Sequence, residues 1–241
     1  MIKLDKVSKR FGTGVFGLSN VSLTVNKGEF VFLVGPSGSG KTSIFRLIIR
    51  ETLPTEGTIF VNDWDVVKLP NSQIPHLRKK VGMVFQDLKL LADRTIFENV
   101  ILPLEIAGML DDAKKRVDDV LQQVGLESHK EKFPIQLSGG ELQRAAIARA
   151  LVLSPDILLA DEATGNLDMN TSWEIIKLLS DINERGTTVL MATHNLDIIK
   201  NLQKRVVELE KGHVVKDSHH KKAEHAHTEK QTEHKEEKES K

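Results

Sequence analysis

The chain has 241 residues, which suits one large or two small domains, and its hydrophobic content of 39% is sufficient for a sizeable core. Its 34 basic residues are balanced by 34 acidic ones, so no overall positive field would draw it to nucleic acid. Cysteine is absent, which excludes disulfides and thiolate chemistry and fits a reducing compartment.

No part of the sequence indicates a membrane or export segment. The N-terminus, Met1–Lys6, lacks the apolar stretch of a signal peptide. No apolar run approaches the roughly 18 residues that a membrane-spanning helix needs. We therefore expect a soluble, cytoplasmic protein that reaches a membrane only through a partner.

The first segments of the chain predict β structure. Residues 2–8 and 21–25 alternate apolar and polar side chains, which is typical of half-exposed strands. Phe11 lies between them. Its ring could stack on an adenine base or could cover an edge of the sheet, and this segment alone favours neither interpretation.

The next stretch is residues 35–42, which match the phosphate-binding pattern G-x-x-x-x-G-K-[ST] in full and are called the P-loop below. An apolar run at 30–34 predicts a buried strand before it, and residues 43–50, free of Gly and Pro, predict a helix after it. In this context backbone N–H groups and the positive end of the helix converge on one anion. Lys41 is expected to reach the β and γ phosphates of a nucleotide, and the Thr42 hydroxyl to ligate Mg²⁺. An ordinary glycine turn after a core strand is disfavoured by so complete a match.

A further strand, 81–85, ends at Gln86, and ligands of α/β folds bind at the carboxyl ends of strands. Taken alone, Gln86 is more simply a solvated loop amide. Residues 87–137 are helical in character, and Asp111 is expected to cap a helix that Gly125 ends. The apolar positions of that helix are Ala113, Val117, Val120, Leu121 and Val124. We therefore expect a helical subdomain inserted into a β-rich plan, over approximately residues 87–150.

A second candidate anion site follows at Ser138-Gly139-Gly140, which opens the alanine-rich, strongly helix-forming run 142–151. Backbone N–H groups at a helix start attract anions by the same physics as in the P-loop. Taken alone, these residues could also form an ordinary N-cap.

Polar side chains also end the next two apolar strands. Residues 157–160 lead into Asp161 and Glu162, and two carboxylates at the end of a buried strand are costly unless they have partners or a function. Asp161 is the candidate carboxylate on the Mg²⁺ side, and Glu162 is the candidate activator of a water molecule. Residues 187–192 end at Thr193 and His194, whose imidazole could donate to a phosphate. A lone His is usually structural, but here other polar strand ends accompany it.

A helix near 170–184 and a terminal hairpin of 205–209 and 213–215 complete the predicted core. Residues 216–241 are rich in His, Lys and Glu and contain no Leu, Ile, Val or aromatic residue, so a disordered tail is expected. Five of the nine histidines lie there, scattered among charges, which disfavours a transition-metal site.

Over residues 1–215 the chain resembles the ATP-binding-cassette (ABC) ATPases. The resemblance is carried by features that occur together in the family's order: the P-loop, Gln86, residues 137–141, Asp161-Glu162, Asp168 and His194. It implies an α/β fold, in which a P-loop NTPase core with a mixed, largely parallel sheet carries an N-terminal antiparallel β subdomain and the inserted α-helical subdomain.

The resemblance also implies a Mg²⁺-dependent ATPase with Glu162, His194 and Lys41 as its catalytic residues. The residues implied at the metal are Thr42, Gln86 and Asp161. The residues implied in nucleotide binding are Phe11, Gly35, Pro36, Ser37, Gly38, Ser39, Gly40, Lys41, Thr42, Ser43, Gln86, Ser138, Gly139, Gly140 and Asp168. The family usually has Tyr at the position of Phe11, which favours stacking on adenine. Ala163 and Leu142 replace the family's frequent Pro and Gln, and neither change touches a chemical role.

The family's two-fold arrangement implies a homodimer formed on ATP binding. Two chains pack head to tail, and each ATP lies between Lys41 of one chain and Ser138 and Gly140 of the other. Hydrolysis then releases the two chains.

Within the family the chain is similar to the cell-division members. The residues that carry this similarity are 84–87, 90–95, 98–100, 103–104 and 165–168. It implies an FtsX-like integral membrane partner, a peripheral location on the cytoplasmic side of the plasma membrane, and regulation of peptidoglycan hydrolysis during division. Lipoprotein-releasing and macrolide-export ATPases share much of this pattern, but Asp87 and residues 93–95 favour the cell-division group.

Other classes of protein are disfavoured. ATPase heads of DNA-repair or chromosome-organising proteins carry a similar signature, but long heptad segments interrupt them, and the stretch from Gln86 to Ser138 is too short for these. A translation-factor relative would need two tandem cassettes. A non-hydrolysing binding module is disfavoured because Glu162 and His194 are both present.

Overall fold

The computed structural model describes residues 1–12, 16–195, 199 and 202–218. The expected tail, with its five histidines, therefore lies outside the described residues from 219 onward. Its first residues differ from the expectation, because the terminal strand β10 (His213–Asp217) includes residues 216 and 217. Within the described residues, no helix is long and apolar enough to cross a membrane.

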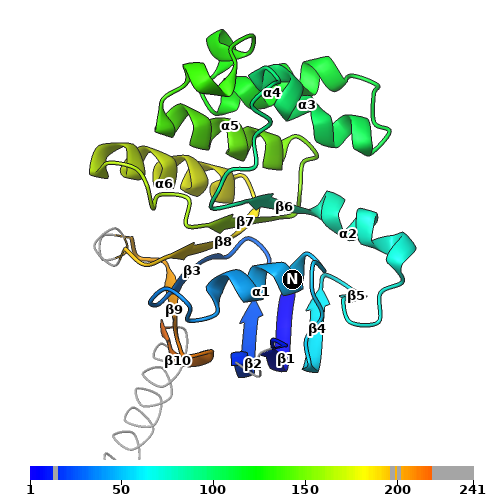
Figure 1. Cartoon of the computed structure of the whole chain (residues 1–241), viewed down its shortest axis with the longest axis vertical. Coiled ribbons are helices and arrows are strands. Elements are labelled where there is room, and N and C mark those ends of the chain that lie inside the picture. The colour runs from blue at the N-terminus through cyan, green and yellow to red at the C-terminus, as the bar shows by residue number, and fades with distance from the viewer. Residues whose placement is uncertain (13–15, 196–198, 200–201, 219–241) are drawn as a thin grey trace, which may run out of the picture.

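The centre of the molecule is a main sheet with the strand order β10-β9-β3-β8-β7-β6 (Figure 1). Its other strands are β3 (Phe30–Val34), β6 (Val81–Val84), β7 (Ile157–Asp161), β8 (Thr188–Thr193) and β9 (Arg205–Glu210). The run from β9 to β6 pairs in parallel, whereas β10 is antiparallel to β9. The predicted mixed, largely parallel sheet is confirmed, and parallel pairing brings the carboxyl ends of β3, β8, β7 and β6 to one edge.

A second, antiparallel sheet has the order β2-β1-β4-β5. Its strands are β1 (Ile2–Arg10), β2 (Phe16–Val25), β4 (Glu56–Val61) and β5 (Trp64–Asp65). Helix α1 (Lys41–Ile48) lies between the two sheets, and its apolar side chains share one buried cluster with both (Figure 1). The predicted N-terminal antiparallel part is thus confirmed, and β4 and β5, which follow the P-loop in the chain, complete it.

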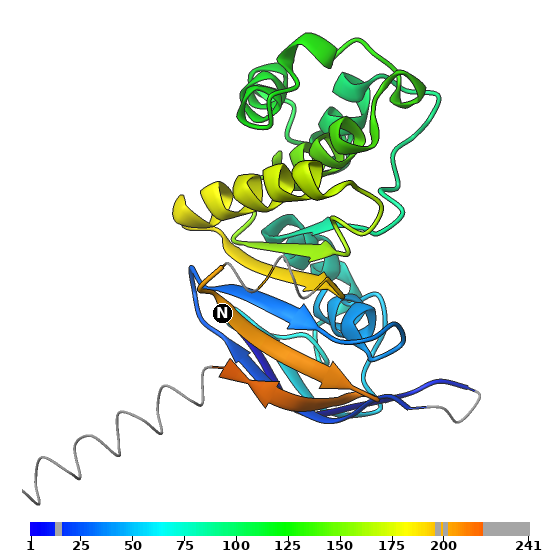
Figure 2. The same cartoon turned by 90° about the vertical axis from the view of Figure 1, so that its left-hand side faces the viewer.

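Helices cover the other face of the main sheet (Figures 1 and 2). Helices α3 (Ile96–Ile106), α4 (Ala113–Gln123) and α5 (Gly139–Leu151) pack on one another as the predicted helical subdomain, and α6 (Met169–Glu184) lies beside them. The remaining helices are η1 (Asn71–Gln73), α2 (Ile74–Lys80), η2 (Glu127–His129) and η3 (Pro134–Gln136).

The predicted cap of α4 is wrong. The N-cap is Asp112 rather than Asp111, it has φ +56°, and its side chain makes no capping bond. The main-chain N–H of Ala113 instead donates to Leu110 O at 3.2 Å. A backbone turn through Leu110 therefore sets the start of this helix, and a cap preference in the sequence could not reveal that.

Side chains of the main sheet alternate between two buried clusters. Phe30, Phe32 and Val34 join the cluster on the helical side, whereas Val31 and Leu33 join the cluster around α1. Each fully buried Phe or Leu contributes roughly 2–3 kcal/mol. Because both faces are covered in this way, the strand ends that carry the candidate site are held firmly in place.

Arg205 stabilises the junction of the two sheets. It donates from Nε and Nη2 to Asp217, and from Nη1 to Glu29 Oε1 at 3.0 Å and to Thr24 O at 2.8 Å. Its side chain is 9% exposed, and its pKa is raised chiefly by the hydrogen bonds to Asp217. The same bonds hold the end of β10 in the hairpin, which explains why the strand reaches Asp217.

We predict that Arg205→Met lowers the free energy of unfolding by roughly 2–4 kcal/mol, because it removes a buried guanidinium that bonds two half-buried carboxylates and a main-chain carbonyl. Thermal unfolding measures the change. Lys68→Met is the matched control, since it removes a cation that is 82% exposed and paired with Asp65. An equal effect of the two changes would contradict the role given to Arg205.

Candidate functional site

The polar strand ends meet at one edge of the main sheet. Val34 is in register with Thr193, Ala192 with Asp161, and Val84 with Ala160. The P-loop, Gln86, the Asp161-Glu162 pair and His194 each follow one of these strands. The parallel register thus brings together four features that lie far apart in the chain.

The P-loop wraps tightly over the start of α1. Gly40 has φ +110°, and a Cβ there would lie 2.6 Å from Gly17 O, so only glycine fits. Residues 36–38 are exposed, whereas Ser39, Gly40 and Lys41 are buried. Lys41 Nζ donates to Gly35 O at 2.8 Å and to Pro36 O at 3.1 Å. The ammonium therefore lies over the loop, where phosphate oxygens could replace these carbonyls.

Three side chains surround the carboxylate of Glu162. Lys41 Nζ lies 3.8 Å and His194 Nδ1 3.4 Å from Glu162 Oε1, and Gln86 Nε2 lies 3.4 Å from Oε2. Glu162 itself has φ +47°, a strained backbone conformation that is typical of functional positions. Burial lowers the pKa of Lys41, and the charges of Glu162 and Asp161 oppose that shift. This cluster can hold a water molecule and several phosphate oxygens.

Asp161 is the candidate Mg²⁺ ligand. Its side chain is 2% exposed, burial raises its pKa, and the hydrogen bond from Thr42 acts in the opposite direction. Its Oδ1 is buried and has no hydrogen-bond partner among the described residues. Mg²⁺ takes hard oxygen ligands, usually one or two from protein, with water and phosphate completing the shell. The orphaned oxygen beside the Thr42 hydroxyl therefore fits the ion. The amide nitrogen of Gln86 points to Glu162, which leaves its amide oxygen for a cation.

Ser138 begins α5 in a capping box with Glu141. Its N–H and hydroxyl both donate to Glu141 Oε2, at 2.7 and 2.6 Å, and the hydroxyl bond is the main cause of the lowered pKa of Glu141. Beside it is a hollow of about 240 Å³, lined by residues 138–140, Arg144, residues 166–168, Thr171 and Glu174. A Cβ on Gly140 would lie 2.5 Å from Thr171 Cγ2, which explains the glycine. Ser138 is thus an N-cap that also borders an open cavity.

Asp168 is placed at the rim of the same hollow as the N-cap of α6. Its Oδ1 accepts from Thr171 N–H at 3.0 Å, and its Oδ2 accepts from the Thr171 hydroxyl, which lowers the pKa of Asp168. No P-loop residue lines this hollow. Helices α1 and α5 also lie on opposite faces of the main sheet (Figure 1). The structure therefore does not join the two predicted anion sites within one chain.

Phe11 lies beside the P-loop. Its ring is 45% exposed and packs over Gly17, whose carbonyl borders Gly40. A second exposed ring, Phe16 at 44%, stacks under the Arg10 guanidinium at 4.2 Å. The sequence interpretation missed this second ring. Its only sequence signal is an aromatic residue beside a glycine-rich turn.

His129 is another residue that the sequence did not single out. Its Nε2 lies 3.0 Å from Glu141 Oε1, on the side of the carboxylate away from Ser138, and its Nδ1 lies 3.0 Å from the Ser128 hydroxyl. No spacing rule links residue 129 to the start of α5, so only the fold could reveal the contact.

Comparisons with known proteins agree with this geometry. The ABC transporter family model matches residues 18–165. The chain is 49% identical over 218 residues to the cell division ATP-binding protein FtsE of Bacillus subtilis, covering 90% of this chain and 96% of that protein. It is 45% identical over 215 residues to FtsE of Escherichia coli K12, covering 89% and 97%.

Among solved structures, the chain matches a bacterial ABC transporter cassette in its dimeric form with a TM-score of 0.82 and 37% identity, covering 90% of this chain and 98% of that one. A dimeric post-hydrolysis cassette bound to ADP and Pi also matches with a TM-score of 0.82, at 36% identity and the same coverage. With the P-loop, the Glu162 cluster and the Ser138 helix start all in place, the chain belongs to the ABC transporter family of ATP-binding proteins and, within it, to the FtsE group of cell division ATP-binding proteins.

Proposed function

We propose that this chain is the ATPase subunit of a cell-division complex, in which ATP binding joins two copies and hydrolysis separates them. The observation that carries the proposal is the convergence of Lys41, Gln86 and His194 on Glu162, beside the orphaned oxygen of Asp161. The complex acts through an FtsX-like integral membrane protein that regulates peptidoglycan hydrolysis. The chain works peripherally, on the cytoplasmic side of the plasma membrane.

Each residue of the site has its own role in nucleotide binding or in hydrolysis. Lys41 and the P-loop N–H groups hold the β and γ phosphates, and the Phe11 ring stacks on adenine.

Glu162 accepts a hydrogen bond from the attacking water and draws its proton as the oxygen adds to the γ-phosphorus. The bond to the β–γ bridging oxygen breaks, and ADP and phosphate leave. His194 and Gln86 donate to the γ-phosphate and the water. Thr42 and Asp161 would hold Mg²⁺, which would neutralise phosphate charge.

A second copy of the chain completes each site. Ser138 and Gly140 border a hollow that no P-loop residue of the same chain lines, so their anion site is free for the nucleotide of a partner. The helix start supplies N–H groups and a positive end for that γ-phosphate. Both cassette structures compared above are dimers.

We predict that Glu162→Gln binds ATP but lowers turnover by about a hundredfold or more, because the amide keeps the shape of the side chain and cannot take a proton. Phosphate release measures turnover, and size-exclusion chromatography with ATP and Mg²⁺ should show an accumulated dimer. Lys41→Ala is the contrasting control, since it should weaken ATP binding and give no dimer. Wild-type turnover by Glu162→Gln would show that another group is the base.

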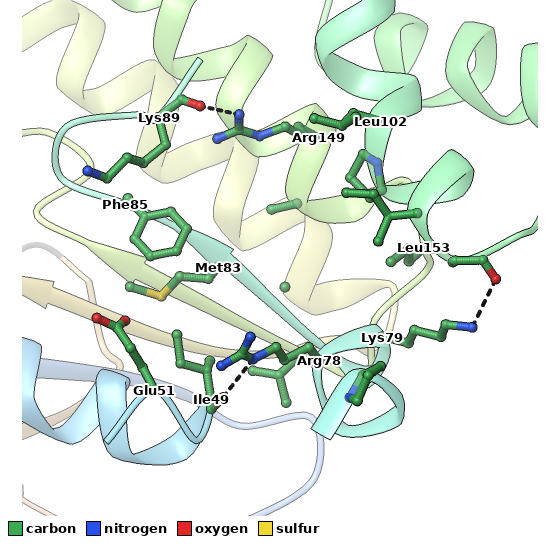
Figure 3. A pocket seen from close by; sticks show the side chains of 17 residues that line it. Ile49, Glu51, Arg78, Lys79, Met83, Phe85, Lys89, Leu102, Arg149 and Leu153 are labelled. Carbon is green, nitrogen blue, oxygen red and sulfur yellow. Dashed lines mark hydrogen bonds between the residues drawn. The ribbon is translucent and has the colours of Figure 1, made fainter. Parts of the chain in front are cut away.

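The membrane partner needs a docking surface near Gln86. A groove of about 680 Å³ lies between α2 and β6 on one side and α3 and α5 on the other (Figure 3). Residues of the segment 87–108 line one wall, and Lys79 Nζ spans the groove to Ala107 O at 3.1 Å. The groove is largely apolar, and a cytoplasmic helix of the partner fits such a surface. We infer that the partner docks there.

We predict that Ile106→Asp lowers co-purification with the membrane partner by about tenfold or more, because it puts an unpaired carboxylate into an apolar contact. Ile106 is 79% exposed and lines the groove. Leu110→Asp is the matched control, since Leu110 is 65% exposed in the same subdomain but does not line the groove. Pull-down from detergent-solubilised membranes measures binding, and ATP turnover of the isolated chain reports an intact ATP site. Equal loss in both variants would contradict docking in the groove.

Depletion of the protein in its source cell tests the biological role. We expect defects in septation or cell separation, because wall hydrolysis at the division site would lose its regulation. Microscopy of depleted cells, with wild-type complementation as control, measures this. Normal division together with lost lipoprotein release or drug export would assign the chain to those transporters instead.

A further inference from the structure

The loop after Gln86 has a strained backbone. Leu88 and Lys89 have φ values of +57° and +53°, in the left-handed region that residues with bulky side chains rarely adopt. Two such residues in succession require contacts that hold them. Leu88 N–H donates to Phe85 O at 3.0 Å and Lys89 N–H to Asp87 O at 2.6 Å, and both bonds stay within the loop itself.

The hydrogen bonds to the turn from outside the loop come from Arg149, near the end of α5. Its Nη2 donates to Leu88 O and its Nη1 to Lys89 O, each at 2.5 Å. Figure 3 shows the bond to Lys89 and the guanidinium at the wall of the groove. A guanidinium presents its donors in a rigid planar fork, which matches two neighbouring carbonyls in this turn. Arg149 therefore holds the two carbonyls of the turn, while the side chain of Leu88 packs against the core on the helical side.

Arg149 is in turn bound to the loop by its charge. Burial lowers its pKa, yet a guanidinium remains protonated at neutral pH. No carboxylate pairs with it among the described residues, and Asp87, the acid of the loop, pairs with Lys89 Nζ instead. The two carbonyls are thus the groups that compensate a half-buried charge. A side chain that only packed against its neighbours would not need these two carbonyls.

We propose that Arg149 is a positioning residue for ATP hydrolysis, through which the helix that begins at Ser138 sets the place of Gln86 opposite Glu162. Gln86 directly precedes the clamped turn, and its amide reaches Glu162 at the long distance of 3.4 Å. A small shift of the turn would remove that contact. Because α5 carries Ser138 at one end and Arg149 near the other, a nucleotide bound at Ser138 is sensed at Gln86. The inference rests on the ATPase function proposed above.

A change of Arg149 should therefore affect the catalytic step and leave ATP binding intact. Arg149 contacts the loop after β6 and not the P-loop, so Lys41 and the phosphate cradle stay intact when it is changed. We expect Arg149→Met to lower kcat by about tenfold or more and to change KM for ATP by less than about twofold. Arg149→Lys keeps a cation but loses the fork, and kcat should recover in part. Arg116→Met is the control for losing a guanidinium from the same subdomain, and should match wild type.

A second pair of variants tests the backbone itself. Lys89→Asn and Lys89→Val both remove the ammonium, but Asn tolerates a positive φ and a β-branched Val does not. Lys89→Asn should retain kcat within about twofold, whereas Lys89→Val should fall as far as Arg149→Met. The double variant Arg149→Met/Lys89→Val should be no worse than either single change, since both act through one turn.

Steady-state kinetics of the full chain, with circular dichroism to confirm folding, decides the outcome. Wild-type kcat in folded Arg149→Met, or equal activity of Lys89→Val and Lys89→Asn, would overturn the positioning role. A rise in KM with kcat unchanged would do the same. If Arg149→Met does not fold, the Lys89 pair decides alone. A wild-type chain without ATPase activity would overturn the proposed function as well, whereas an active wild type with indifferent variants overturns this inference only.

Discussion

The structure depends on two carboxylates and one ammonium that are held together at the carboxyl-terminal edge of the main sheet, the ammonium by the first residue of α1. Asp161 is 2% and Lys41 5% exposed, so neither charge is well solvated. Burial raises the pKa of Asp161 and lowers that of Lys41, which shows the cost of keeping both ionised. The charges of Asp161 and Glu162 therefore stabilise the ammonium of Lys41, and the Thr42 hydroxyl bonds to Asp161. A nucleotide with its cation would complete this charge distribution, because its phosphate oxygens would face the ammonium and the cation would face the orphaned oxygen of Asp161.

The packing around this cluster differs between the two faces of the main sheet. On one face, α1 is enclosed by both sheets, so the P-loop is carried by a helix that shares its core with each of them. On the other face the helical subdomain shares a core with the sheet, including Val84 of β6, and a groove opens between α3 and α2. Across that groove the contacts are side chain to backbone bonds, such as Lys79 to Ala107 O. The fold thus encloses the phosphate cradle between two sheets, and it joins the helical subdomain to the Gln86 loop through the Arg149 hydrogen bonds and the packing of Leu88 and Leu90.

Local patterns in the sequence predicted a large share of this arrangement. The P-loop motif specifies its own strand, turn and helix, because only glycine permits the close backbone approach at Gly40. Continuous apolar runs predicted β3, β7 and β8, whose side chains are buried on both faces. Parallel strands end at one edge, which is why the residue pattern alone could group Gln86, Asp161, Glu162 and His194. Propensity failed at the start of α4, where a turn through Leu110 overrides the expected Asp111 cap.

The sequence by itself therefore determined the chemistry of the site: which side chains carry charge, which glycines are obligatory, and which strands are buried. Only the tertiary structure decided which other residues each of these groups contacts. It placed Phe16 under Arg10, His129 behind Glu141, and Arg149 on the carbonyls of Leu88 and Lys89. It also put the P-loop and Ser138 on opposite faces of the main sheet. The physical reason is that residue type and local periodicity act over a few neighbours, whereas these contacts join backbone and side chains up to 61 residues apart, and their partners are fixed only when the sheet and helices pack.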